Sequence, residues 1–245
     1  MMQAMIFAAG LGTRLKPLTD RMPKALVPVA GKPLLQHVLD KVYGAGASRV
    51  VVNVHHFANQ IVDYVNDHCH DKDISISDET SQLLETGGGI KHARHLFDSD
   101  APILIHNVDI LSNVDLNGFF ESNKDADAAL LVSERKTKRY LLFDDAMRLV
   151  GWTNIETGER RSPYEWVHKA DISSLRMYAF SGIHLFSPRL FPLMDSWDDR
   201  FGIMDFYLDS CAKANIRGYL KDDLRLMDVG KIDTLADADA FVGKL

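Results

Sequence analysis

The stretch that decides the fold lies at the N-terminus, where residues 4–15 read Ala-Met-Ile-Phe-Ala-Ala-Gly-Leu-Gly-Thr-Arg-Leu. Its apolar run from Met5 to Ala9 predicts a strand buried on both faces, which is typical of a parallel sheet. The run leads into a loop with two glycines, a hydroxyl group and Arg14, and Lys24 follows in the next segment. Glycines let backbone N–H groups turn toward an anion, and the two cations add positive charge. The stretch therefore predicts a polyphosphate cradle at the carboxyl end of the first strand.

Residue spacing excludes two better-known phosphate loops. A P-loop needs Gly-Lys-Ser/Thr to begin five positions after its first glycine, but those positions after Gly10 and Gly12 hold Leu15 and Pro17. A dinucleotide-binding loop needs a third glycine, and that position is again Leu15. A nicotinamide-dependent dehydrogenase is therefore disfavoured.

Length and charge indicate how many domains the chain forms and which partners it is expected to bind. A chain of 245 residues, 46% hydrophobic and 25% charged, is long enough for one folded α/β domain. The formal net charge is −6 and no block of five or more basic residues occurs, which argues against a nucleic-acid partner. Anionic substrates would need local positive charge, and the opening loop supplies it.

The cysteines and the N-terminal residues indicate in which cellular compartment the protein is expected. Cys69 and Cys211 are far apart and form no Cys-x-x-Cys motif, so a disulfide framework is not expected and a reducing compartment fits. No signal peptide and no run of about 18 apolar residues is recognisable, which favours a cytoplasmic location without membrane contact. The sequence leaves open whether the protein is a monomer or a homo-oligomer.

The pattern along the chain predicts an α/β fold with a Rossmann-like, mostly parallel sheet flanked by helices. Strands are expected near residues 5–9, 49–54, 74–76, 102–109, 127–133, 177–186, 216–220 and 224–229, and a hairpin near residues 140–152. Helices are expected near residues 33–43, 58–68, 84–97, 190–194, 203–214 and 234–242. The polar segment 153–174 is expected to be a mobile loop over the site. No repeat or linker is recognisable, so residues 1–245 are expected to form one domain.

A second glycine cluster, Thr86-Gly87-Gly88-Gly89, opens one of the expected helices. Glycines at a helix entry allow close approach by a flat or anionic ligand. The cluster therefore predicts a second ligand contact beyond the opening loop.

Two aspartates lie at the carboxyl ends of predicted strands, Asp109 in residues 102–109 and Asp228 in residues 224–229. Ligands of open α/β sheets bind at the carboxyl edge of the strands, and Mg²⁺ is held by one or two carboxylates plus substrate phosphates. The alternative is that each aspartate caps a turn or forms a salt bridge. Together with the phosphate loop, the pair predicts an Mg²⁺ site.

The chain resembles the sugar-phosphate nucleotidyltransferases, also called NDP-sugar pyrophosphorylases. The resemblance rests on Gly-x-Gly-Thr-Arg-Leu at residues 10–15, on Pro-Lys-x-Leu at 23–26, and on later landmarks at 53–61, 84–90, 107–109, 180–183 and 228–230. The Leu-Glu-Thr-Gly-Gly-Gly-Ile segment and the short length are most similar to bacterial N-acetylmuramate-1-phosphate uridylyltransferases, with mannose-1-phosphate guanylyltransferase-like proteins also near. The resemblance implies transfer of a nucleotidyl group from an NTP to a sugar-1-phosphate, with Mg²⁺ as cofactor and a cell-wall or polysaccharide precursor as product.

The resemblance also implies roles for individual residues. A nucleotide-binding half would span about residues 1–112 and a sugar-binding half about 113–245. Catalytic roles fall on Arg14, Lys24 and Asp109, and metal binding on Asp109 and Asp228. Nucleotide contacts fall on Ala8, Ala9, Gly10, Gly12, Thr13, Glu79, Thr86 and Gly87, and sugar contacts on Asn107 and Gly182.

Some positions depart from the family pattern. Val108 replaces a small residue beside the metal ligand, Lys231 stands where Thr is expected, and residues 165–168 read Glu-Trp-Val-His where a Glu-Lys-Pro motif is expected. These departures bear on the identity of the sugar. The alternative function is a non-catalytic nucleotide-sugar-binding regulatory subunit, which would be expected to have lost an acid or a phosphate-side cation.

Overall fold

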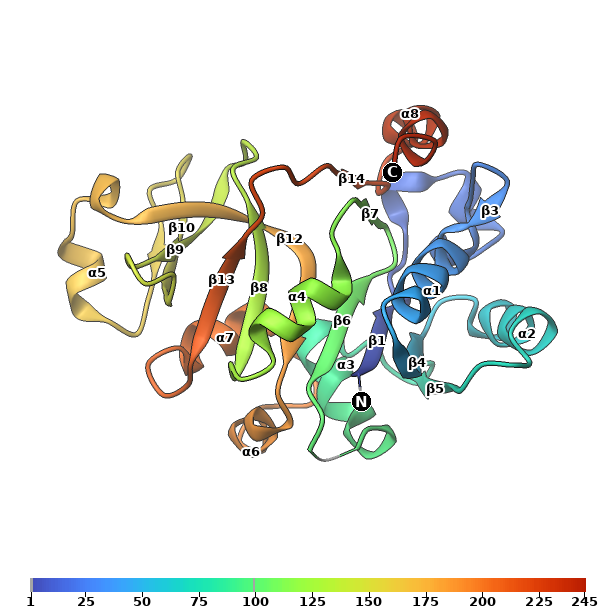
Figure 1. Ribbon diagram of the computed structural model, residues 1–245, viewed down its shortest axis with the longest axis horizontal. Coiled ribbons are helices and arrows are strands. Elements are labelled where there is room, and N and C mark those ends of the chain that lie inside the picture. Colours follow the sequence, from blue (N-terminus) through green and yellow to red (C-terminus); the bar gives the residue numbers. More distant parts are fainter. Residues whose placement is uncertain (1, 99) are drawn as a thin grey trace.

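A ten-stranded sheet forms the centre of the molecule in the computed structural model, which describes residues 2–98 and 100–245 (Figure 1). Its strands are β1 (Met2–Phe7), β4 (Ala47–Val54), β5 (Ile74–Asp78), β6 (Ile103–Asn107), β8 (Ala128–Ser133), β9 (Arg139–Phe143), β10 (Leu149–Asn154), β11 (Arg160–Arg161), β12 (Arg176–Phe186) and β13 (Ile216–Leu220). Two small ribbons pair β2 (Pro28–Val29) with β3 (Lys32–Pro33), and β7 (Ile110–Ser112) with β14 (Leu226–Asp228). The helices are α1 (Leu34–Gly44), α2 (Ala58–His68), α3 (Glu85–His92), α4 (Leu116–Asn123), α5 (Glu165–Lys169), α6 (Phe191–Met194), α7 (Ile203–Ser210) and α8 (Ile232–Val242).

The strand directions confirm the predicted mostly parallel sheet. β5, β4, β1 and β6 are neighbours and run parallel. β12 is antiparallel to both β6 and β8, so β8 and its parallel neighbour β13 run in the same direction as β1. The carboxyl ends of these six strands therefore point to one edge of the sheet, where ligands of such folds bind.

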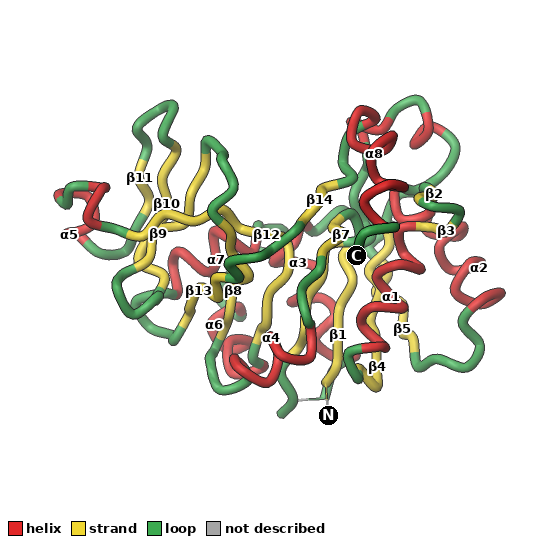
Figure 2. The backbone as a smooth tube through the Cα atoms, turned by 45° about the horizontal axis from the view of Figure 1, so that its top comes forward, coloured by secondary structure: helices red, strands yellow, loops and turns green. Residues whose placement is uncertain are grey.

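Helices cover both faces of the sheet, which explains why β1 is apolar apart from Gln3. Ala4 and Ile6 of β1 face a core shared with α1, α2 and α4, whereas Met5 faces a core shared with α3, α6 and α7. All three side chains are fully buried. Figure 2 shows the same layering from a second direction.

Residues 153–174 differ from their prediction as a mobile loop over the site. They include β11 and α5, and Val167 of α5 packs in a small core with Leu142 and Val150. Arg160 donates hydrogen bonds to the carbonyl oxygens of Val167 and Ala170. Figures 1 and 2 place α5 at one end of the molecule, well away from β14 and α8. The few apolar anchors in a polar sequence were too sparse to predict this packing.

The strand expected at residues 224–229 also differs from its prediction. β14 is shorter and pairs with β7 rather than with the main sheet. This pairing decides where Asp228 lies.

Candidate active site

In the loop after β1, the first two backbone amides donate hydrogen bonds within the protein, whereas the next two have no partner among the described residues. The amides of Ala8 and Ala9 donate to Asn53 Oδ1 at 2.8 and 3.3 Å. Gly10 is exposed with open space where a Cβ would stand, and neither Gly10 nor Leu11 has a hydrogen bond to a described residue. The part of the loop free to receive an anion therefore begins at Gly10.

Gly12 has a structural role in the same loop. Its φ is +63°, and a Cβ there would lie 2.8 Å from Thr19 Cγ2 and 3.1 Å from Lys24 Cβ. Thr19 Oγ1 donates to the Gly12 carbonyl oxygen at 2.8 Å, while Leu15 anchors the turn in the core. Glycine is required here because the backbone is left-handed and the Lys24 segment packs directly against it. Thr13 and Arg14 follow and are exposed.

Lys24 and Asp109 form an ion pair between Nζ and Oδ2. Their side chains are only 11% and 16% exposed, so the pair lies at the base of the site rather than on the open surface. Asp109 was expected to be the last residue of a strand. It lies instead in the turn between β6 and β7. The fold thus brings Lys24 of the predicted phosphate cradle into contact with Asp109 of the predicted metal site.

The ribbon of β7 and β14 brings Asp228 to Asp109. Asp228 is paired with Ile110, the residue that follows Asp109, and the Val229 amide donates to the Asp109 carbonyl oxygen at 2.8 Å. Two carboxylates far apart in sequence are thus held by neighbouring backbone. Figure 1 shows β7 and β14 side by side next to α8.

Gly230 marks the point on which the charged groups converge. A Cβ placed on Gly230 would lie 2.6 Å from Asp228 Oδ1, 3.0 Å from Arg14 Nη2 and 3.4 Å from Lys24 Nζ. Because Gly230 has no side chain, the space among these groups stays open. Arg14, Lys24 and Asp228 therefore meet at one place, and Asp109 joins them through its ion pair with Lys24.

The acid pair suits a small divalent cation. Burial beside its neighbours and the negative charge of Asp109 raise the pKa of Asp228, although the residue as a whole is exposed; Lys24, Arg14 and Arg135 act in the opposite direction. No group of three or more His, Cys, Asp or Glu residues with metal-binding geometry occurs within 2–98 and 100–245. Two carboxylates facing an open phosphate loop fit Mg²⁺, which usually completes its shell with water and substrate phosphate oxygens.

Glu79 lies beneath the site with both carboxylate oxygens occupied. It is 1% exposed, and its oxygens accept hydrogen bonds from Asn53 Nδ2 at 2.7 Å and from the Leu84 amide at 3.1 Å. Burial raises the pKa of the Glu79 carboxyl, against these hydrogen bonds. Glu79 thus links the ends of β1 and β4 to the entry of α3, which is a positioning role rather than an open contact surface.

The second glycine cluster is explained by packing within the protein. A Cβ on Gly87 would lie 2.3 Å from the Phe201 ring, and one on Gly88 would lie 2.1 Å from the Asp199 carbonyl oxygen. The amides of both glycines donate to the Phe201 carbonyl oxygen, and Thr86 Oγ1 accepts from the Ile203 amide at 2.9 Å. These glycines therefore allow close approach of the 199–203 segment, and contact of Thr86 and Gly87 with a nucleotide stays a prediction.

Asn107 and Gly182 meet beside Asp109. Gly182 has a φ of +76° within an irregular part of β12, and a Cβ there would lie 3.0 Å from Asn107 Nδ2. The two residues assigned to the sugar thus adjoin each other and the metal-site turn. The departure at Val108 is accommodated because its side chain is buried in the core. Lys231 is exposed at the start of α8.

The sequence patterns assigned no role to Arg135, which lies close to Gly182. It follows β8, is exposed, and donates from Nη2 to the Phe180 carbonyl oxygen at 3.1 Å. The signal available in the sequence was the basic run Arg135-Lys136-Thr137-Lys138-Arg139 directly after a predicted strand.

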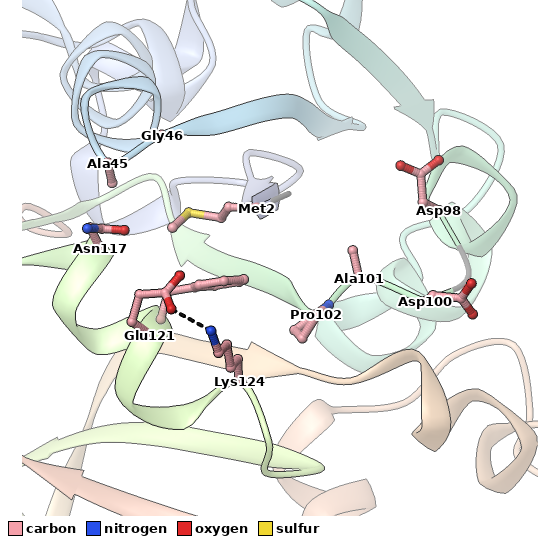
Figure 3. Close-up of a pocket in the computed structure, with 11 residues that line it drawn as sticks. Met2, Ala45, Gly46, Asp98, Asp100, Ala101, Pro102, Asn117, Glu121 and Lys124 are labelled. Atoms are coloured by element: carbon pink, nitrogen blue, oxygen red, sulfur yellow. Dashed lines mark hydrogen bonds and ion pairs between the residues drawn. The ribbon is translucent and has the colours of Figure 1, made fainter.

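A cavity of about 620 Å³ lies at the opposite edge of the sheet (Figure 3). It is lined by the start of β1, the segment before β6 and one side of α4. Lys124 is the one cation among its lining residues, and it is paired with Glu121 at 2.6 Å; Asp98 and Asp100 add further negative charge. This cavity is therefore unsuited to a polyphosphate.

Comparison with known proteins decides the family. The family model described as nucleotidyl transferase matches residues 3–244. This chain belongs to the nucleotidyl transferase family. It is 30% identical over 194 residues to UTP–glucose-1-phosphate uridylyltransferase AglF of Haloferax volcanii, covering 78% of this chain and 74% of that protein. It is 50% identical over 113 residues to N-acetylmuramate α-1-phosphate uridylyltransferase of Caulobacter vibrioides, covering 43% of this chain and 45% of that one.

The matched segments span about half the length of both N-acetylmuramate relatives, 45% for the Caulobacter protein and 52% for that of Neisseria meningitidis. Among solved structures, HddC from Yersinia pseudotuberculosis complexed with GMP-PN has a TM-score of 0.76 at 22% identity, covering 99% of this chain and all of that one. The inositol-1-phosphate CTP transferase from T. maritima has a TM-score of 0.74 at 14% identity, over 96% and 91%. These structural neighbours share the fold of this nucleotidyl transferase. No helix within its described ranges has the length and apolar character needed to span a bilayer.

Proposed function

We propose that this nucleotidyl transferase moves a nucleotidyl group from an NTP to a sugar-1-phosphate and releases pyrophosphate. A phosphate oxygen of the sugar-1-phosphate attacks the α-phosphorus, the bond from that phosphorus to the β-phosphate bridging oxygen breaks, and pyrophosphate leaves with the electron pair. The attacking oxygen is already an anion, so no general base is required. Catalysis then consists of positioning and charge stabilisation.

The observation that carries the proposal is the convergence of Arg14, Lys24, Asp109 and Asp228 around Gly230. Arg14 and the open amides from Gly10 would bind the triphosphate, and Lys24 would stabilise charge that develops on the transferred and departing phosphates. Asp109 and Asp228 would hold Mg²⁺, which when bound neutralises phosphate charge and aligns the reacting oxygens. A regulatory subunit without activity would have no reason to keep this complete set.

The nucleotide would bind mainly to residues 1–112, and the sugar to residues 113–245 together with Asn107. Four relatives carry uridylyltransferase names, two of them acting on N-acetylmuramate α-1-phosphate and two on glucose-1-phosphate. UTP with N-acetylmuramate α-1-phosphate is therefore the first pair to test. We place the reaction in the cytoplasm, in supply of a cell-wall or polysaccharide precursor.

A pyrophosphate-release screen tests the proposal. Purified protein with Mg²⁺ is combined with UTP, GTP, dTTP or CTP and with the α-1-phosphates of N-acetylmuramate, glucose and mannose. At least one pair should release pyrophosphate in step with formation of the nucleotide sugar, and chelation of Mg²⁺ should stop it. Binding of a nucleotide sugar without turnover of any pair would instead favour the regulatory function.

A further inference from the structure

Arg135 reaches the site from the half of the chain opposite to the nucleotide loop. It follows β8, whose carboxyl end points to the same edge of the sheet as those of β1 and β6. Its Nη2 donates to the Phe180 carbonyl oxygen at 3.1 Å, in the irregular part of β12 that also contains Gly182. Because Gly182 adjoins Asn107, this hydrogen bond holds the guanidinium group on the sugar side of the Asp109 turn.

The cations around the acid pair differ in whether their charge is already balanced. Lys24 is neutralised by Asp109, whereas neither Arg14 nor Arg135 forms an ion pair with a carboxylate of the described residues. Two guanidinium groups without acidic partners therefore lie at the carboxyl edge of the sheet, Arg14 beside Gly230 and Arg135 beside Phe180.

The proposed reaction brings two phosphate groups of different origin to this place. The triphosphate would lie along the glycine loop with Arg14, so the phosphate of the sugar has to enter from the other half. A guanidinium group matches a phosphate because two parallel N–H groups can donate to two of its oxygens. Arg135 has donors left over after its single hydrogen bond to Phe180.

We infer that Arg135 binds the phosphate group of the sugar-1-phosphate and orients it for attack, an inference that rests on the proposed function. Arg14 then binds the phosphates of the NTP, and Arg135 binds the phosphate of the sugar-1-phosphate. The hydrogen bond to Phe180 keeps the Arg135 side chain in place before the sugar binds.

Steady-state kinetics of Arg135→Ala with the substrate pair found in the screen test this inference. Loss of a charged hydrogen-bonding partner should raise KM for the sugar-1-phosphate about 10- to 100-fold and leave KM for the NTP within about 2-fold. Arg135→Lys keeps the positive charge but lacks the two parallel N–H groups of a guanidinium. Its KM for the sugar-1-phosphate should therefore lie between those of the wild type and Arg135→Ala. Arg139→Ala is the matched control, an exposed arginine in the same basic run, and should keep both KM values.

The possible results distinguish failure of the Arg135 role from failure of the proposed function. An unchanged sugar-1-phosphate KM in Arg135→Ala, a rise confined to the NTP, or an equal effect in Arg139→Ala overturns the role of Arg135 and leaves the proposed function intact. A folded wild-type protein that turns over no pair overturns the proposed function and this inference with it. Circular dichroism of each variant shows whether the fold survives.

Discussion

The amide of Val229 donates a hydrogen bond of 2.8 Å to the carbonyl oxygen of Asp109, and this backbone contact joins the two halves of the acid pair. Together with the pairing of Asp228 with Ile110, it fixes Asp228 beside Asp109 through main chain rather than through flexible side chains. The positions of both carboxylates are thus set before any ligand binds, which reduces the ordering cost of forming a metal site.

Replacement of either acid by asparagine should abolish metal-dependent turnover. Asp109→Asn and Asp228→Asn keep size and one oxygen but remove a charge, so each should lower kcat by at least about 10²-fold. The double variant should lose little more, because the two residues act as a unit. Steady-state kinetics check this, and thermal melting confirms folding. Two modest, independent and additive losses would identify two separate structural carboxylates.

Lys24→Ala should lower kcat by about 10²-fold or more, the scale for removing one preorganised charge from a transition state. Lys16→Ala is the matched control, because Lys16 is an exposed lysine of the same loop region, paired with Asp20 at 3.0 Å. The control should keep near-normal kcat. A Lys24→Ala enzyme with the same activity as this control would remove Lys24 from the mechanism.

Lys24 should also compete with metal for Asp109, because its Nζ occupies Asp109 Oδ2. Lys24→Met is therefore expected to bind Mn²⁺ several-fold more tightly than the wild type when no nucleotide is present. Electron paramagnetic resonance of free Mn²⁺ measures this affinity without reference to turnover. Equal or weaker Mn²⁺ binding by Lys24→Met would contradict the competition.

Gly88→Ala should destabilise the fold, because the new Cβ would lie 2.1 Å from the backbone oxygen of Asp199. Overpacking of this kind costs about 1–3 kcal/mol, which denaturant unfolding can measure. Gly44→Ala is the control, since Gly44 ends α1 and no atom beyond its chain neighbours and its own helix backbone lies within 4 Å of the added methyl group. It should be neutral or slightly stabilising. Equal stability of both variants would show that α3 can move away from residues 199–203.

Acid should destabilise the protein through buried His184. Burial lowers the pKa of His184 to about 3, and its Nδ1 lies 2.7 Å from the Tyr207 hydroxyl oxygen. The unfolded chain takes up a proton first as the pH falls below the ordinary value of 6.5, so stability present above 6.5 is lost between 6.5 and about 3. The loss approaches about 1.4 kcal/mol per pH unit for one such group.

His184→Gln tests this pH dependence, because glutamine can accept from the Tyr207 hydroxyl but does not titrate. Its free energy of unfolding should fall less steeply than that of the wild type between pH 6.5 and 4.5. His70→Gln, at an exposed position, should leave the slope unchanged. A wild-type slope in His184→Gln would assign the acid sensitivity to other groups, such as buried His106, whose pKa burial lowers to about 4.

The sequence by itself determined the elements whose signal is local. Continuous apolar runs predicted β4 and the presence of β1, although β1 spans Met2–Phe7 rather than residues 5–9. Apolar spacing predicted α2 with both of its observed bounds, because helix burial repeats over a few residues. The loop after β1 and the cations Arg14 and Lys24 were likewise recognisable, since glycine and charged residues have few other uses at that spacing. Family membership followed from the same motifs.

Only the tertiary structure decided which distant residues meet. The β7–β14 ribbon places Asp228 beside Asp109, and no property of either short strand specifies its partner. Contacts across the fold likewise packed the Gly87–Gly88 pair against residues 199–203 and brought Arg135 to the Phe180 carbonyl oxygen, near Gly182 and Asn107. Such pairings depend on the shape of the whole folded chain, whereas a sequence window contains only the periodicity of its own residues. The identities of the charged residues were therefore set by the sequence, and their arrangement around Gly230 by the fold.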